Sequence, residues 1–134
     1  MRYIGNKTKL LDFIHEQILS VCGDISNASF CDLFSGSGTV ARYFKQHCAS
    51  VIANDLEDYS YVLSRNYVGN NEEFESEELI KHLNEIPNVK GKFYNTLSPA
   101  GGRMFFTEYN AQRIDAIRQE IDKLPITEDQ YYFL

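Results

Sequence analysis

Two glycines and an aspartate are spaced in this sequence as a nucleoside-binding site requires. Gly36 and Gly38 follow a short apolar run at 30–34 and precede a helical pattern, so they predict a tight turn between a strand and a helix. Such a turn brings the backbone close to a ligand and leaves the N–H groups of the helix start free. Asp55 ends the next apolar run, where a carboxylate can accept hydrogen bonds from both hydroxyls of a ribose.

The charge of Asp32 narrows the class of cofactor. Gly36, Gly38 and Ala41 satisfy the Gly-x-Gly-x-x-Ala pattern of dinucleotide sites, so an NAD-binding oxidoreductase domain is one alternative. Asp32 is predicted to end the first strand and to face the ligand. A carboxylate there suits the cationic amino group of S-adenosylmethionine and repels a pyrophosphate. We therefore favour S-adenosylmethionine as the cofactor.

Apolar periodicity predicts the elements that position these residues. Helical spacing at 7–22, at 40–44 and after Asp58, which is expected to cap its helix, alternates with apolar runs at 30–34 and 51–53. The amphipathic helix before the first strand is foreign to a simple dinucleotide-binding unit. Helices that alternate with short, wholly apolar strands indicate an α/β fold whose parallel sheet is covered by helices.

The second half of the chain is predicted to consist of helices and loops. Helices are expected over 76–86 and 107–124, with a long loop over 87–102 between them. A capping-box signature at 127–130 predicts a further helix. We accordingly divide the chain into a cofactor-binding part, residues 1–70, and a helical and loop extension, residues 71–134.

The C-terminal residues suggest a chain that is cut off in mid-structure. The last predicted helix begins with a complete cap but has barely two turns before Leu134, and an isolated helix of that length is marginal in water. Large apolar residues at 131–134 would also need covering. They leave open a second alternative, a non-catalytic remnant or partner subunit that associates with a second chain or with itself.

Composition limits the remaining possibilities. A net charge of −6 argues against a chain whose whole surface binds nucleic acid. Within it, residues 87–106 contain Lys90, Lys92 and Arg103 but no acidic residue, which makes this loop either a DNA contact or an ordinary solvated loop. The cysteines and histidines have no metal-binding spacing, His15 being expected at the surface. No apolar run is long enough for a membrane span, so we expect a cytoplasmic protein.

Three segments resemble the D12, or Dam-like, class of DNA adenine-N6 methyltransferases. Residues 2–7 (Arg-Tyr-Ile-Gly-Asn-Lys) are similar to the N-terminal motif of that class, residues 32–38 (Asp-Leu-Phe-Ser-Gly-Ser-Gly) to its cofactor loop, and residues 53–56 (Ala-Asn-Asp-Leu) to its ribose-binding segment. A motif of the first kind before the glycine loop is missing from most other methyltransferase classes. The resemblance implies a Rossmann-like S-adenosylmethionine-dependent methyltransferase fold, incomplete here because the chain matches only the N-terminal portion.

The resemblance also implies a set of cofactor-binding residues. They are Tyr3, Lys7, Asp32, Phe34, Ser35, Gly36, Gly38, Asn54 and Asp55. Lys7 would meet the carboxylate of the cofactor and Asp32 its amino group, while Tyr3 would pack beside the methionine or adenine part. Asp55, with Asn54 beside it, would hold the ribose, and the remaining residues would shape the loop.

The catalytic motif of the family is absent from the chain. That motif, Asp/Asn/Ser-Pro-Pro-Tyr/Phe, hydrogen-bonds the adenine amine and stacks on a base that has been flipped out of the duplex. The prolines of this chain, Pro87, Pro99 and Pro125, are all unpaired. The resemblance thus implies that double-stranded DNA is the substrate of a complete enzyme, expected in a restriction-modification system. It places the catalytic motif beyond Leu134 and predicts no turnover by these residues alone.

Overall fold

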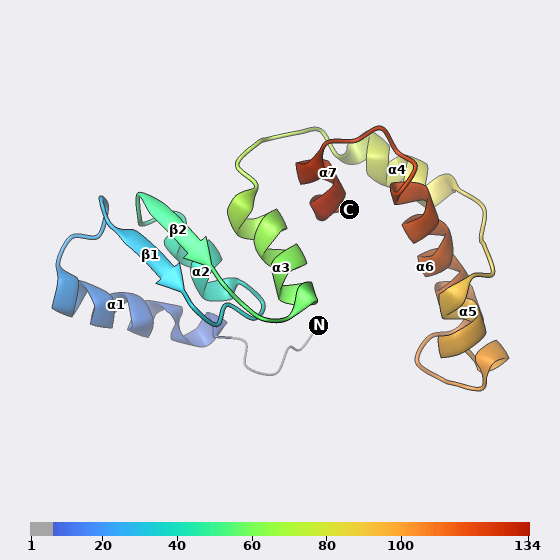
Figure 1. Ribbon diagram of the computed structural model, residues 1–134, viewed down its shortest axis with the longest axis horizontal. Helices are drawn as coiled ribbons and strands as arrows, with labels where there is room; N and C mark the ends of the chain where they lie inside the picture. The colour runs from blue at the N-terminus through green and yellow to red at the C-terminus, as the bar shows by residue number, and fades with distance from the viewer. Residues whose placement is uncertain (1–6) are drawn as a thin grey trace. The chain divides into compact units, whose positions relative to one another are not determined.

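The computed structural model describes residues 7–134 and divides into two compact units, Met1–Glu72 and Glu73–Leu134 (Figure 1). The elements of unit 1 are a 3-10 turn Thr8–Leu10, α1 Leu11–Cys22, β1 Ser29–Asp32, α2 Thr39–Phe44, β2 Ser50–Ala53, α3 Asp58–Ser64 and a π-helical turn Arg65–Gly69. Those of unit 2 are α4 Glu77–Glu85, α5 Lys92–Leu97, a 3-10 turn Pro99–Gly101, α6 Glu108–Ile121 and α7 Glu128–Phe133.

The two strands of unit 1 form a parallel sheet, as the alternation of helices and strands predicts. The register pairs Ser29 with Ser50 and Asp32 with Ala53. Strand β1 ends at Asp32, as predicted, and the last two residues of the apolar run at 30–34 lie in the turn that follows it. Phe34 is 83% exposed in that turn.

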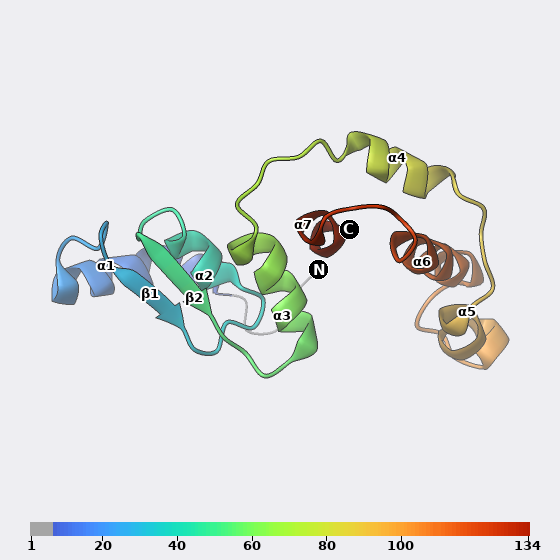
Figure 2. The ribbon, with the colours of Figure 1, turned by 45° about the horizontal axis from the view of Figure 1, so that its top comes forward.

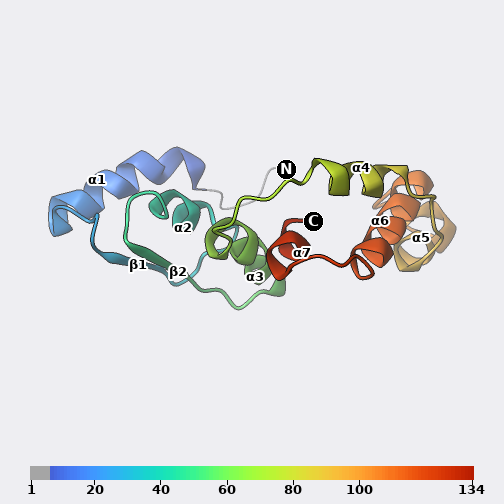
Figure 3. The ribbon, with the colours of Figure 1, turned by 90° about the horizontal axis from the view of Figure 1, so that it is seen from above.

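Helix α2 lies between the sheet and α1 (Figure 3). The buried ring of Phe44 stacks on Phe30 of β1 with centroids 4.2 Å apart. On its other side α2 meets His15 of α1, whose Nδ1 lies 2.8 Å from the Tyr43 hydroxyl. The expectation that His15 is a surface residue is therefore wrong. Its position shares the inward face of α1 with the half-buried Ile14 and Ile18.

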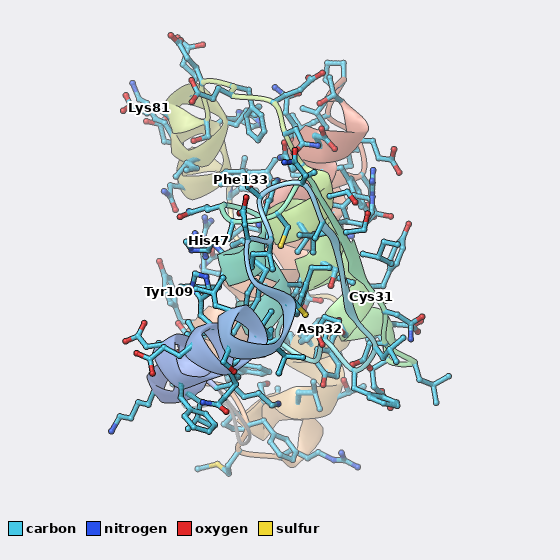
Figure 4. All side chains as sticks on the ribbon, turned by 90° about the vertical axis from the view of Figure 1, so that its left-hand side faces the viewer. Cys31, Asp32, His47, Lys81, Tyr109 and Phe133 are labelled. Carbon is cyan, nitrogen blue, oxygen red and sulfur yellow. The ribbon has the colours of Figure 1, made fainter. Side chains whose placement is uncertain are left out.

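The opposite face of the sheet is open. Cys31 of β1 and Ile52 of β2 project from that face, and Ile52 is 57% exposed. Asp32, next to Cys31 at the end of β1, lies on the other face and is half-buried (Figure 4). Asp32 therefore lies at the same end of the sheet as the residue that follows Ala53.

Helix α6 organises unit 2 through two charged side chains. The guanidinium of Arg113 donates to the carbonyl oxygens of Leu83 and Ile86, each at 2.6 Å, where α4 ends. The carboxylate of Asp115 is buried and accepts hydrogen bonds from backbone N–H groups at the start of α5. These contacts place α4 and α5 beside α6 (Figure 2).

The prediction of a long loop over 87–102 is wrong, since α5 and the Pro99–Gly101 turn lie within it. The cap of α5 is the Asp115 side chain, which comes from a distant part of the sequence and leaves no local signal. The prediction that Asp58 caps α3 is also wrong, because Asp58 is the first helical residue and Glu57 precedes the helix.

The local signals for the last two helices are confirmed. Helix α6 begins after Thr107, and α7 begins with the predicted capping box. In that box Thr127 Oγ1 accepts from the N–H of Gln130 at 3.2 Å, and Gln130 Oε1 accepts from the N–H of Thr127 at 2.9 Å. Within residues 7–134, no helix combines the length and the apolar character that crossing a membrane requires.

Candidate cofactor site

The glycine bend between β1 and α2 is one wall of the site. Gly36 and Gly38 have φ angles of 52° and 71°, in the left-handed region that side chains with a Cβ rarely adopt. The N–H of Gly38 donates to the carbonyl of Ser35 at 2.8 Å, and Gly38 precedes the first residue of α2. This tight turn brings the loop back toward the end of β2.

Asp55, immediately beyond β2, joins the two loops of the site. Its Oδ2 accepts from the N–H of Gly36 at 2.7 Å, and its Oδ1 accepts from the N–H of Glu57 at 3.1 Å. These hydrogen bonds lower the pKa of Asp55 below its ordinary value of 3.8 because they stabilise the carboxylate form, and the hydrogen bond from Gly36 has the largest effect. Asp55 is therefore an anion at neutral pH.

Serine side chains fasten the bend to α3. Ser35 Oγ lies 3.3 Å from Ser60 Oγ and 3.5 Å from Ser64 Oγ. Ser35 and Ser60 are both buried, with exposed fractions of 8% and 0%. Buried hydroxyls require partners, so this network fixes the position of the bend on the helix.

A cleft of about 270 Å³ opens in front of the bend, slightly below the range of about 300–1,000 Å³ for small-molecule sites. Its lining residues come from the end of β1, from both loops, from α2 and α3, and from the chain before α1. They are Lys7, Asp32, Phe34, Ser35, Gly36, Ser37, Thr39, Val40, Asp55 and Tyr59. The cleft thus contains one cationic and two acidic side chains.

Most of the residues that the sequence assigns to the cofactor come together in this cleft. Gly38 and Asn54 are not among its lining residues. The side chain of Asn54 donates to the carbonyl of Leu33 at 3.0 Å, while its backbone N–H donates to that of Asp32 at 2.8 Å, so Asn54 holds the ends of the two strands together. Tyr3 lies outside the described residues.

Four cleft residues were not predicted from the sequence. Ser37 and Thr39 flank Gly38, and their hydroxyl oxygens lie 2.9 Å apart. Val40 lies in the first turn of α2, and Tyr59 lies in the first turn of α3 with 45% of its surface exposed. For Ser37, Thr39 and Val40, the sequence signal that could have identified them was their proximity to the glycine bend. For Tyr59 there was no such signal, because the sequence does not show which side of α3 faces the cleft.

The charges of the cleft suit a ligand that carries both signs and hydroxyl groups. Carboxylates at Asp32 and Asp55 favour an ammonium group or hydroxyl donors, whereas Lys7 favours an anion. Among the described residues, no group of three or more histidine, cysteine or acidic side chains is arranged to hold a metal ion.

Sequence comparisons relate nearly the whole chain to one protein family. The family described as D12 class N6 adenine-specific DNA methyltransferase matches residues 3–134. Type II methyltransferase M.NlaIII of Neisseria lactamica is 42% identical over 142 residues, which cover 100% of this chain and 42% of that protein. Modification methylase LlaI of Lactococcus lactis subsp. lactis is 38% identical over 135 residues, covering 92% of this chain and 21% of LlaI.

A viral relative shows the same partial coverage. Type II methyltransferase M.CviAII of Paramecium bursaria Chlorella virus 1 is 34% identical over 145 residues, covering 98% of this chain and 42% of that protein. The chain thus spans about two fifths of M.NlaIII and M.CviAII and about one fifth of LlaI. No solved structure matches the chain significantly.

Proposed function

The chain belongs to the D12 class of N6 adenine-specific DNA methyltransferases, and on that premise we propose that the cleft of unit 1 binds S-adenosylmethionine. When bound, this cofactor supplies a methyl group activated on a sulfonium. The residues of the chain bind and orient it. The whole protein transfers the methyl group to N6 of adenine in double-stranded DNA, as part of a restriction-modification system.

The observation that carries this proposal is the hydrogen bonding of Asp55. A carboxylate offers about four lone-pair positions on its two oxygens. The N–H groups of Gly36 and Glu57 each occupy one of them, on different oxygens. Asp55 also lines the cleft, and these hydrogen bonds fix the orientation of its carboxylate, which is then held ready to accept hydrogen bonds from the hydroxyls of a ribose.

The other end of the cleft fits the amino-acid part of the cofactor. Asp32 pairs with the ammonium group and Lys7 with the carboxylate, since the two side chains of opposite charge line the same cleft. The exposed rings of Phe34 and Tyr59 offer apolar faces for the adenine. Tyr3, which belongs to the same family motif as Lys7, completes the set at the methionine or adenine part.

We further propose that β1 and β2 begin a Rossmann-like sheet. Parallel sheets occur almost only where helices cover both faces. Here α2 covers one face, while Cys31 and Ile52 are exposed on the other. Further strands and helices of the whole protein would cover this surface. The same protein would supply the residues that hold an adenine flipped out of the duplex, since none of the 134 residues forms a Pro-Pro pair.

Calorimetry on the protein as its gene encodes it tests the cofactor. S-adenosylhomocysteine should bind to the wild-type protein, and Asp55→Ala should weaken binding by about tenfold or more, because two ribose hydrogen bonds to a charged acceptor are lost. Asp58→Ala is the matched control, an exposed carboxylate that does not line the cleft. Unchanged affinity in Asp55→Ala, or binding of NADH in place of S-adenosylhomocysteine, would overturn the proposal.

A further inference from the structure

Unit 2 exposes large apolar side chains at the corner between the Pro99–Gly101 turn and α6. Met104 is 87% exposed, Phe105 is 70% exposed, and Tyr109 in the first turn of α6 is 64% exposed. Arg103, also exposed, directly precedes them. We call residues 103–105 the apolar corner. Neighbouring apolar side chains left in water mark surfaces that bind another molecule.

The backbone holds the apolar corner in a defined shape. The carbonyl of Ser98 accepts from the N–H groups of Gly101 at 2.9 Å and of Arg103 at 3.1 Å. At the other end of the corner the N–H of Phe106 donates to the carbonyl of Leu97 at 3.2 Å. Ser98 itself is fully buried. The corner is therefore anchored on both sides, so that presenting Met104 and Phe105 to a partner costs little ordering entropy.

The packing beneath the corner adds to this rigidity. The ring of Phe106 meets Phe93 of α5 edge to face, with centroids 6.1 Å apart. Helix α5 is in turn capped by the buried carboxylate of Asp115 on α6. Phe106 is thus turned into unit 2, whereas its neighbour Phe105 is turned into solvent.

The segment of the chain that contains the apolar corner is positively charged. In a chain with a net charge of −6, residues 87–106 carry Lys90, Lys92 and Arg103 and no acidic residue. Lys90 Nζ lies over the ring of Tyr94, 5.0 Å from its centroid. The nearest acidic residue along the chain, Glu108, accepts a hydrogen bond from the Tyr94 hydroxyl at 3.2 Å. A cationic segment that includes exposed apolar side chains suits a polyanion that also has an apolar interior, and Arg103 directly precedes these side chains in the sequence.

We propose that the apolar corner is a contact surface for duplex DNA. Arg103 pairs with a backbone phosphate, and Met104 and Phe105 enter a groove and press against base edges or between base steps. The inference rests on the proposed function, which makes duplex DNA the substrate, and adds the residues through which unit 2 meets it.

Fluorescence anisotropy with a labelled duplex, on the protein as its gene encodes it, tests the corner. The double variant Met104→Ser/Phe105→Ser should raise Kd by about tenfold or more. Arg103→Gln should lower the slope of log K against log salt by about one. The matched controls, Val21→Ser for an apolar residue that is 84% exposed and Lys81→Gln for an exposed cation on α4 (Figure 4), should leave both values unchanged.

Two further measurements separate the possible failures. Calorimetry with S-adenosylhomocysteine on the same samples reports the cofactor site, so retained cofactor binding with weakened DNA binding in the double variant supports the proposal. Wild-type DNA affinity in the double variant overturns it, while the proposed cofactor function stands. Sedimentation that reveals a wild-type dimer, which the double variant breaks without changing DNA affinity, also overturns it and assigns the corner to a second copy of the chain.

Discussion

The backbone N–H of Gly36 donates a hydrogen bond to Asp55 Oδ2 across 2.7 Å, and so joins the loop after β1 to the loop after β2. The carboxylate that we propose as the ribose acceptor is thus also a structural partner of the glycine bend. Its orientation is set before any ligand arrives, because a second N–H, that of Glu57, holds the other oxygen. Two consequences can be measured, one in the titration of Asp55 and one in the strain of the bend.

The first prediction concerns acid. The pKa of Asp55 is lowered from 3.8 in the folded protein by the hydrogen bonds from Gly36 and Glu57. The stability that this carboxylate contributes should therefore be complete above about pH 4 and be lost as the pH falls through the lower, folded pKa. A carboxyl-carbon NMR titration should give Asp55 a midpoint below 3.8. A midpoint at or above that value would contradict the hydrogen-bonded geometry.

The second prediction concerns Gly38. A Cβ at this position would lie 3.9 Å from Ser64 Oγ, an ordinary contact, so the cost of Gly38→Ala should come from its φ of 71° and reach about 1–2 kcal/mol. Urea unfolding of Gly38→Asn should show a smaller loss, since asparagine tolerates the left-handed region better. Gly102→Ala is the control, with a φ of 74° and nothing within 4 Å of its Cβ. Both alanine variants should lose stability, but only Gly38→Ala should weaken cofactor binding.

The third prediction concerns Asp115. It is only 3% exposed and accepts from the N–H groups of Gly91, Phe93 and Tyr94 at 2.8–2.9 Å. Asp115→Ala leaves these donors without their acceptor and should destabilise unit 2 by about 3 kcal/mol. Asp122→Ala, which removes an exposed partner of Arg118, should change stability by less than about 0.5 kcal/mol. Equal losses for the two variants in thermal unfolding would refute the capping role.

Local patterns predicted the parts of the fold that local chemistry determines. The capping box of Thr127 and Gln130 lies within four residues and is confirmed in the structure. Helix α5 was not predicted, because the backbone N–H groups at its start donate hydrogen bonds to Asp115, which is more than twenty residues away in the sequence. The inward orientation of the His15 side chain was not predicted for the same reason, since its partner Tyr43 lies on another helix. Sequence spacing does not reveal contacts that only tertiary packing creates.

The part of the cleft that is formed by the ends of the two strands and the glycine bend could be predicted from the sequence. Asp32 and Asp55 lie at the carboxyl ends of neighbouring parallel strands, and the glycine bend is read directly from the sequence. Tyr59 was not predicted to line the cleft, because the side of α3 that faces the cleft depends on how this helix packs against the rest of unit 1. That docking is fixed by the buried contact of Ser35 with Ser60, and a buried serine pair has no recognisable sequence pattern.

The last prediction compares two phenylalanines. Phe44 is fully buried and stacks on Phe30, so Phe44→Ala should leave a cavity in unit 1 and cost about 3–5 kcal/mol. Phe105→Ala deletes the same ring from a position that is 70% exposed and should cost less than about 0.5 kcal/mol. Urea unfolding followed by circular dichroism distinguishes them. A large loss of stability in Phe105→Ala would mean that the ring already packs within the protein, which would remove it from any surface available to DNA.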